Sequence, residues 1–187
     1  DGYAVIRNRY DKVGNLVECS LYDINNKLCY SKDGYARLLN SYDSLGNLIE
    51  TSSYAPDGKL CYDNSRVSRR VDDYDVKGFL KEQSFYGIDG NACYCIDGYA
   101  RVVNTYDSLG NLEEQIFYGL DGKPCNNING YARLKNKHDF HGNMIEQSYF
   151  NSRGVPCFHK NGFYKVCSKY DGNSNKTTVA DKSNDKY

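Results

Sequence analysis

The tripeptide Gly-Tyr-Ala recurs along this chain with a fixed period, which is the interval from Gly2 to Gly34 or a multiple of it. The copies are Gly2-Tyr3-Ala4, Gly34-Tyr35-Ala36, Gly98-Tyr99-Ala100 and Gly130-Tyr131-Ala132, with Gly162-Phe163-Tyr164 as a weakened further copy. A fixed period of about 20 to 50 residues is typical of tandem-repeat proteins. We therefore divide the 187 residues into repeats at 1–32, 33–64, 65–96, 97–128 and 129–160, a partial repeat at 161–170 and a polar tail at 171–187.

Each repeat has the pattern of a β-meander. In the fourth repeat, residues 99–106 and 111–118 are rich in β-branched and aromatic side chains, which favour strands. The segments 107–110 and 119–122 between and after them each end in Gly, as in a type I turn followed by a left-handed residue. A short third strand is expected near 123–125, and no stretch favours a helix. The prediction is an all-β fold of tandem 32-residue β-meander repeats, stacked as an elongated β-solenoid or as a single-layer repeat sheet.

Period-two alternation assigns one face of each second strand to the core. That face carries Leu or Met, Glu, a small or apolar residue, and Tyr or Phe in every repeat, so it includes Glu18, Glu50, Glu82, Glu114 and Glu146. We expect these carboxylates to lie across the hairpin from Asn8, Asn40, Asn104 and Asn136, whose amides offset the cost of burial. Asp72 takes the Asn place in the third repeat and is expected to face Glu82.

The first turn opens with an Asp in every repeat, at Asp11, Asp43, Asp75, Asp107 and Asp139. We expect its side chain to accept hydrogen bonds from turn amides. The string Tyr42-Asp43-Ser44-Leu45-Gly46-Asn47-Leu48 resembles the YD repeats of RHS-type proteins. This resemblance implies β-hairpin arrays of the kind found in bacterial surface and toxin-delivery proteins. The chain departs from that family in its strict 32-residue length and its recurring cysteine.

Five of the eight cysteines are one repeated position: Cys29, Cys61, Cys93, Cys125 and Cys157. In a flat sheet, equivalent positions lie two strand spacings apart, about 10 Å. A disulfide needs Cα atoms within about 7 Å, so neighbouring equivalents could bond only in a solenoid. The row is therefore a candidate for a disulfide ladder or for a ladder of free, partly buried thiols, and the sequence favours the thiols.

All three histidines lie in the fifth repeat, and His138, His141, Cys157 and His159 superficially resemble a metal-ligand set. His138 stands where other repeats have Tyr, so packing is the favoured interpretation and we expect no metal site. The sequence has no catalytic signature, and we expect neither an enzyme nor a cofactor. Asn175, in the triplet Asn175-Lys176-Thr177, is a candidate glycosylation site.

The 24 basic and 24 acidic residues balance, which argues against nucleic-acid binding, and no apolar run is long enough to span a membrane. The leading hypothesis is a non-enzymatic, extracellular or cell-surface structural protein that self-associates through its repeat ends into a filament or acts in adhesion. The alternative is a repeat module that binds a glycan or another surface ligand in Tyr-lined grooves, because 19 tyrosines supply flat rings with a polar tip. Exposed tyrosine rows favour the second hypothesis, and buried ones favour the first.

Overall fold

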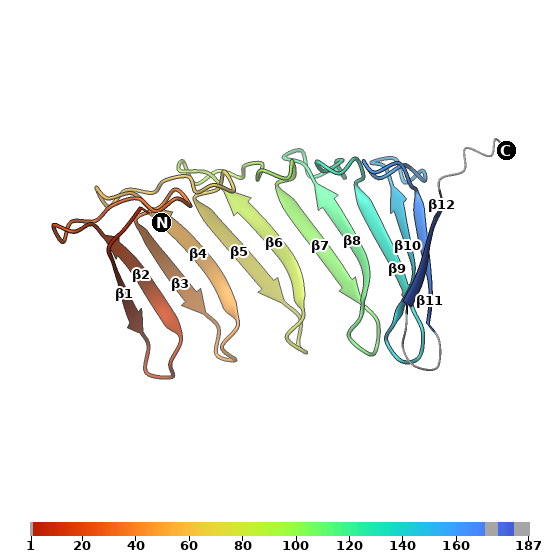
Figure 1. Ribbon diagram of the computed structural model, residues 1–187, viewed down its shortest axis with the longest axis horizontal. Coiled ribbons are helices and arrows are strands. Elements are labelled where there is room, and N and C mark those ends of the chain that lie inside the picture. Colours follow the sequence, from red (N-terminus) through yellow and green to blue (C-terminus); the bar gives the residue numbers. More distant parts are fainter. Residues whose placement is uncertain (1, 171–175, 182–187) are drawn as a thin grey trace. The chain divides into compact units, whose positions relative to one another are not determined.

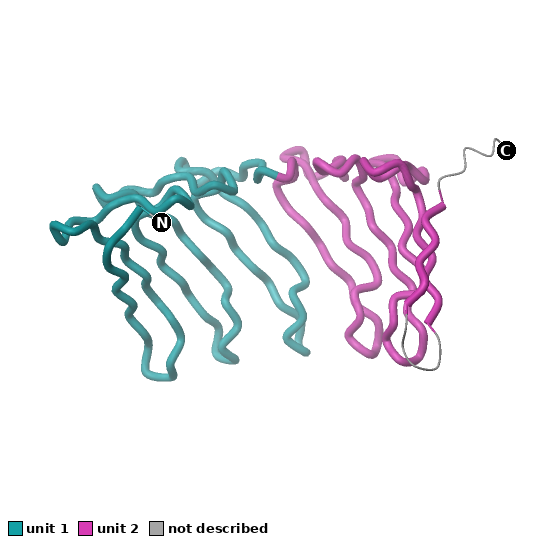
Figure 2. Tube along the Cα trace, in the orientation of Figure 1, with its two compact units in different colours: residues 1–96 teal, residues 97–187 magenta. Residues whose placement is uncertain are grey.

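The computed structural model describes residues 2–170 and 176–181, and the chain divides into two compact units, residues 1–96 and 97–187 (Figure 2). Unit 1 contains the strands β1 (Val5–Tyr10), β2 (Leu16–Tyr22), β3 (Arg37–Tyr42), β4 (Leu48–Tyr54), β5 (Arg69–Tyr74) and β6 (Leu80–Tyr86) (Figure 1). Unit 2 contains β7 (Arg101–Tyr106), β8 (Leu112–Tyr118), β9 (Arg133–His138), β10 (Met144–Phe150), β11 (Lys165–Tyr170) and β12 (Lys176–Asp181). The described residues form no helix.

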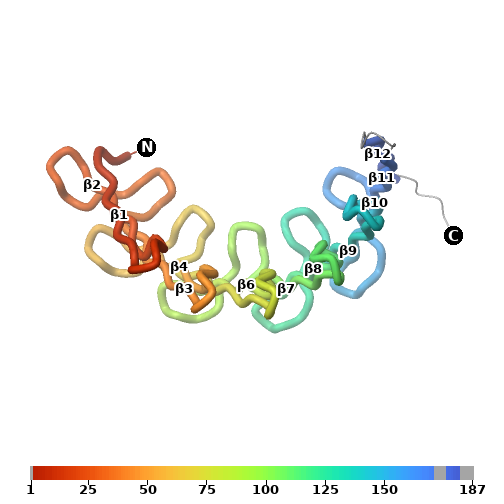
Figure 3. The backbone as a smooth tube through the Cα atoms, turned by 90° about the horizontal axis from the view of Figure 1, so that it is seen from below, coloured from red at the N-terminus to blue at the C-terminus, as the bar shows by residue number. Residues whose placement is uncertain are grey.

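Within each unit, every strand pairs antiparallel with the next strand of the chain. The predicted all-β fold is confirmed, and the antiparallel pairing decides between its two versions. A solenoid stacks equivalent strands of successive repeats in parallel, whereas here consecutive strands form one open layer in each unit. Figure 3, which looks along the strands, shows that layer with loops projecting on both of its sides.

The expected short third strand is wrong. After the second turn the chain makes one isolated bridge to the end of the second strand, such as Tyr54↔Leu60, and then enters a third turn. Gly34 closes one of these turns with a φ of 89°, and its N–H donates to Ser31 O at 3.2 Å. The glycine of Gly-Tyr-Ala is therefore a turn residue, and too few residues remain before that turn to form a strand.

In the five hairpins from β1–β2 to β9–β10 the register differs from the expectation by one residue, whereas β11 pairs with β12 without such a shift. A bulge beside the first turn pairs Tyr42 with Leu48 and then Ser41 with Glu50. The prediction that Asn faces Glu is therefore wrong, because the extra residue moves Asn40 opposite Thr51. The predicted pair of Asp72 and Glu82 is wrong for the same reason, since Asp72 faces Gln83.

The core also lies on the face opposite to the predicted one. In unit 2 the buried cluster comprises Val102, Phe117, Tyr131, Leu134 and Tyr149. Phe117 and Tyr149 belong to the variable face of their strands, while the Leu, Glu and Tyr of the regular face are half-buried. The carboxylates of this half-buried face lie beside basic side chains of the first strands, as Glu114 does beside Lys135 at 3.2 Å.

Residues 176–181 of the expected polar tail form β12, which pairs with β11 from Lys165↔Asp181 to Tyr170↔Lys176. Lys176 stands five repeat lengths after Leu16, the residue that begins the second strand of the first repeat. Strand β12 is thus the second strand of a sixth hairpin. Residues 171–175 and 182–187 lie outside the described part, and so does the glycosylation candidate Asn175.

Candidate interaction surfaces

One face of the sheet, here called the charged face, carries the Glu row together with a basic residue at the start of each following first strand. Arg69 Nη1 lies 3.1 Å from Glu50 Oε2, and Lys165 Nζ lies 2.8 Å from Glu146 Oε2. The hydrogen bond from Lys165 lowers the pKa of Glu146 and raises that of Lys165. Because these pairs join consecutive hairpins, the Glu row is a structural element of the repeat stack.

Arginines of the first strands, three of them from this basic row, also contact the tyrosines that end the second strands. A guanidinium lies over a Tyr ring in four hairpins, with distances to the ring centroid of 4.3 Å for Arg7 and Tyr22, 5.0 Å for Arg37 and Tyr54, 4.3 Å for Arg69 and Tyr86, and 4.5 Å for Arg101 and Tyr118. Cation–π contacts at exposed sites contribute about 0.5–1 kcal/mol each. The contacts with Arg thus explain why Tyr recurs at this half-buried position.

The opposite face carries the hydrogen bonds that tie one hairpin to the preceding one. Asn40 Nδ2 and Tyr42 Oη both donate to the carbonyl oxygen of Leu16, at 2.9 Å each. The equivalent contacts recur from Tyr74 to Leu48, from Asn136 to Leu112 and from Tyr170 to Met144. The Tyr of the Tyr-Asp motif and the Asn two residues before it therefore join neighbouring repeats.

The first-turn aspartates cap turn amides as expected. In Asp43, Oδ1 accepts the N–H groups of Leu45 and Asn47 at 2.9 Å, and Oδ2 accepts the Asn47 side-chain amide at 2.8 Å. These hydrogen bonds lower the pKa of Asp43, and the bond from the Asn47 side chain has the largest effect. The cap also explains why Asn follows Gly in the motif Tyr-Asp-x-x-Gly-Asn.

All eight cysteines are free, and the five repeated ones point at backbone rather than at one another. Each donates its thiol to the carbonyl oxygen 27 residues earlier, over distances from 3.5 Å for Cys29 and Gly2 to 3.8 Å for Cys125 and Gly98. Burial raises the pKa of Cys61, Cys93 and Cys157. The row therefore fastens the second-turn loop of a repeat to the start of the same repeat.

The four residues of the candidate metal set do not converge. His138 ends β9 and His141 lies in the adjoining first turn, where it contacts Phe140. His159 lies in the third turn, stacked on Phe163 with ring centroids 5.0 Å apart, and its Nδ1 accepts the N–H of Asn161. Cys157 donates to Gly130 O. Across the described residues, no group of three or more His, Cys, Asp or Glu is placed to hold a metal ion.

A row of exposed tyrosines crosses the loops of unit 1. Tyr30, Tyr62 and Tyr94 each follow a repeated cysteine and are 50%, 47% and 46% exposed. A Cβ placed on Gly87 would lie 2.9 Å from Tyr62 Oη, so this side chain rests against the second turn of the next repeat. The row is periodic, about 10 Å per repeat in a two-strand unit. Their place directly after the repeated cysteine is the sequence signal that separates them from the partly buried tyrosines of the strands.

A hollow of about 500 Å³ lies on unit 2 over β8, β9 and β10. Its lining includes Glu114, Lys135, Lys137 and Glu146. These charges pair with one another, since Lys135 Nζ lies 3.2 Å from Glu114 Oε1 and Lys137 Nζ lies 3.2 Å from Glu146 Oε1.

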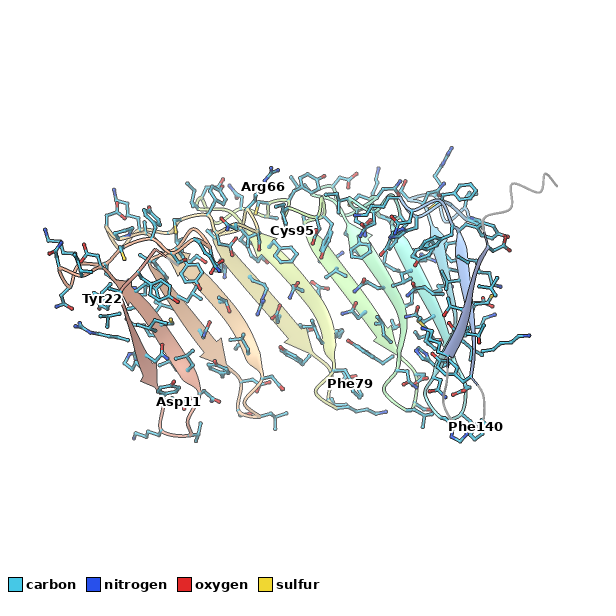
Figure 4. The ribbon with its side chains drawn as sticks, in the orientation of Figure 1. Asp11, Tyr22, Arg66, Phe79, Cys95 and Phe140 are labelled. Carbon is cyan, nitrogen blue, oxygen red and sulfur yellow. The ribbon has the colours of Figure 1, made fainter. Side chains whose placement is uncertain are left out.

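Figure 4 shows the side chains of both units on their strands and loops.

No family model and no curated protein matches this chain. Among solved structures, it is similar to a chain in the crystal structure of TcdB2-TccC3-Cdc42, with 13% identity and a TM-score of 0.36. It is also similar to a chain in the structure of the Photorhabdus luminescens Tc holotoxin pore, with 14% identity and a TM-score of 0.37. Each match covers 94% of this chain and 9% of the other. The resemblance to YD repeats itself rests on the Tyr-Asp motif and on the regular hairpins that the structure forms.

Among the residues that the structure describes, no helix is long and apolar enough to cross a membrane.

Sequence reasoning located the repeat, the turns and the recurring residue types, but it did not reveal how the Asn, Tyr and Cys side chains contact neighbouring segments. The sequence did contain a signal for these contacts. Polar residues that recur at the same position of the repeats, outside the apolar positions, indicate side chains that make the same contact in each repeat.

Proposed function

We propose that the chain is a non-enzymatic structural module of an extracellular or cell-surface protein, in which stacked repeats supply length and a surface for adhesion. The observation that carries this proposal is the recurrence of the contacts between successive repeats. The donors to the Leu16, Leu48 and Leu112 carbonyls come from two recurring positions of the first strand, the Asn of Asn40 and Asn136 and the Tyr of Tyr42 and Tyr74, so a repeat can be added with the same chemistry.

The chemistry of the fifth repeat supports a non-enzymatic role. Cys157 and His159 are the pair closest to a nucleophile and a base. The thiol of Cys157 donates to a backbone carbonyl and has a raised pKa because of its burial, which disfavours the reactive thiolate. The His159 ring is packed among Tyr131, Tyr149 and Phe163. Both side chains therefore serve packing and loop attachment.

The surface location can be tested on intact cells of the source organism. An antibody against the 187-residue chain is expected to label unpermeabilised cells, and external protease is expected to remove the signal while a cytosolic marker survives. Beads coated with the chain should adhere to a surface or host matrix to which uncoated beads do not. Labelling only after permeabilisation would contradict the proposed location, and equal retention of coated and uncoated beads would contradict adhesion.

A second function, glycan binding, is favoured by the exposed row of Tyr30, Tyr62 and Tyr94. Exposed aromatic rings with a hydroxyl tip suit the apolar faces and hydroxyl groups of sugars. Their spacing of about 10 Å suits a linear polysaccharide that contacts several repeats together. This role is compatible with the scaffold, because the row lies on the loops and leaves the strand contacts unaltered.

The test is affinity electrophoresis against linear neutral polysaccharides. Replacing Tyr30, Tyr62 and Tyr94 with Ala together is expected to abolish any retardation of the native chain. The matched control replaces three exposed apolar residues of the first turns, Val13, Leu45 and Val76, with Ala. Retardation that survives the tyrosine variant, or that is absent from the native chain, would exclude this row as a glycan site.

A further inference from the structure

Each first turn that the structure describes carries one large apolar side chain that projects into solvent. These side chains are Val13, Leu45, Val76, Leu109 and Phe140, which are 83%, 75%, 99%, 68% and 82% exposed. Single apolar side chains are common on protein surfaces, but one in each of these turns is a recurring feature of the repeat. Because the side chains are exposed, packing within the hairpin does not explain them.

The position of the apolar residue within the turn is not fixed. Counted from the capping Asp, it is the third residue for Val13, Leu45 and Leu109 and the second residue for Val76 and Phe140. The tyrosines that donate to the preceding hairpin, by contrast, keep one position in the repeat. The turns therefore share an apolar tip rather than one particular contact.

The first turns of a unit lie at one end of its strands. Since consecutive strands are antiparallel, the turns after β1, β3 and β5 leave the sheet at the same end, and the second turns leave it at the opposite end (Figure 1). Neighbouring first turns are two strand spacings apart, about 10 Å. Unit 1 thus presents Val13, Leu45 and Val76 in one row, here called the tip row. In unit 2 the turns after β7 and β9 present Leu109 and Phe140 in the same way (Figure 4).

The backbone of these turns is hydrogen-bonded within the turn itself. Asp11 Oδ1 accepts the N–H groups of Val13 and Asn15 at 2.9 Å each, and the Gly14 N–H donates to the Asp11 carbonyl oxygen at 3.3 Å. The turn after β3 has the same bonds. An unpaired N–H group is costly in apolar surroundings. A turn that pairs these groups internally can enter such surroundings without that cost.

The spacing of the tip row favours a lipid surface over a protein partner. Side chains about 10 Å apart on separate turns form no continuous patch. Three of them cannot supply the roughly 800 Å² that each partner of a stable protein complex buries. A fluid bilayer has no fixed shape to match, so it can accept separate side chains. We propose that the tip row inserts into the surface of a lipid bilayer and holds the chain there by its first turns.

The residues beside the tips suit the headgroup region of a bilayer. Lys12 precedes Val13, and Lys77 follows Val76. A Lys side chain can lay its apolar stem along the bilayer surface and keep its ammonium group among the headgroups. Insertion therefore buries the apolar tips while the neighbouring charges stay in water. This membrane contact is additional to the proposed adhesion and glycan binding, and it uses none of the exposed tyrosines.

Flotation of the whole chain with phosphatidylcholine vesicles tests the proposal. The native chain is expected to float with these vesicles in low and in high salt, because apolar insertion does not depend on the attraction of opposite charges. Replacing Val13, Leu45 and Val76 with Ser together is expected to lower the partition coefficient by at least about tenfold.

The matched control replaces three exposed apolar residues of unit 1 that lie in the loops at the opposite end of the strands. These are Ile24, Ile88 and Ile96, which are 87%, 51% and 47% exposed. Their triple Ser variant should float like the native chain. Circular dichroism establishes that both triple variants keep their strands.

A fluorescent reporter locates the contact independently of these losses. The chain contains no Trp, so Leu45→Trp introduces a single indole ring at a tip. Its emission is expected to shift to shorter wavelength when phosphatidylcholine vesicles are added, and brominated lipid should quench it. Ile24→Trp, in the second turn, should show neither effect.

A native chain that does not float with phosphatidylcholine vesicles would overturn the inference, as would a tip-row variant that floats like the native chain. Binding that requires anionic lipid and is lost in high salt would show charge attraction in place of insertion. Equal quenching of the two reporters would exclude the tip row as the site of contact. Surface labelling and bead adhesion do not depend on these results, so failure of this inference is distinguishable from failure of the proposed function.

Discussion

Asp72 is the residue at which the third repeat departs most clearly from the chemistry of the others. It is 5% exposed, and its Oδ1 accepts the Gln83 side-chain amide at 2.9 Å. Burial raises its pKa above the usual value, against the opposing effect of Gln83 and Arg70. Asn40 and Asn136, at the same position, instead donate to the carbonyl of the preceding hairpin. Asp72 cannot donate in its ionised form, so the third hairpin lacks this donor at neutral pH.

Asp72→Asn is therefore expected to stabilise the protein at pH 7 by about 1 kcal/mol, through removal of a buried charge and gain of a donor to Leu48 O. The pKa of Asp72 is higher in the folded than in the unfolded protein. Its ionisation therefore costs no folding stability below the unfolded-state pKa, and the cost grows as the pH rises from that value through the folded-state pKa. The gain should thus shrink towards pH 3. Urea unfolding at several pH values measures it, with Asp73→Asn on the exposed neighbour as control. Destabilisation at pH 7 would show that the ion pair with Arg70 outweighs both effects.

At the scale of the hairpin, sequence patterns predicted strands and turns but misassigned the two faces. The turn signature of Asp, two residues and Gly located the loops correctly, because positive φ angles and amide caps depend on local chemistry. The bulge between Ser41 and Tyr42 adds one residue to the second strand and thereby shifts every cross-strand partner. A one-residue shift in register places each residue opposite a different partner and changes the face on which it lies. The amino-acid composition of a strand does not reveal such a shift. The Glu and Tyr of the regular column recur because they contact basic side chains on a half-buried face.

The donors between hairpins provide a test at this scale. Tyr74→Phe removes the hydroxyl that donates to Leu48 O at 3.1 Å and keeps the ring, so the unfolding free energy should fall by about 1 kcal/mol. Tyr10→Phe is the matched control, because β1 follows no described hairpin and its change should be much smaller. Both variants can be compared by urea unfolding of dilute protein. Equal losses would mean that the hydroxyl does not stabilise the junction.

For the whole chain, the strand and turn patterns within the 32-residue period predicted the all-β class, whereas the polar composition of the last segment concealed the strand β12. β12 lacks the Leu, Glu and Tyr of other second strands, so its sequence resembles a tail. It pairs with β11 along six residue pairs, and the Ser168 and Thr178 hydroxyls are also 3.4 Å apart. Edge strands carry weak side-chain signals because only one of their sides is packed.

The cysteines allow the repeat geometry of the whole molecule to be tested chemically. Equivalent residues lie about 10 Å apart in a sheet of two-strand repeats, beyond the reach of a disulfide, so the chain purified in air should yield eight free thiols after denaturation. In the native state, the raised pKa of Cys19, Cys61, Cys93 and Cys157 should slow their reaction near pH 8, whereas exposed Cys167 should react first. Thiol titration with and without denaturant measures both effects, and Cys167→Ser should remove the fast phase. A yield of six or fewer intact thiols would place cysteines within bonding distance and contradict the open sheet.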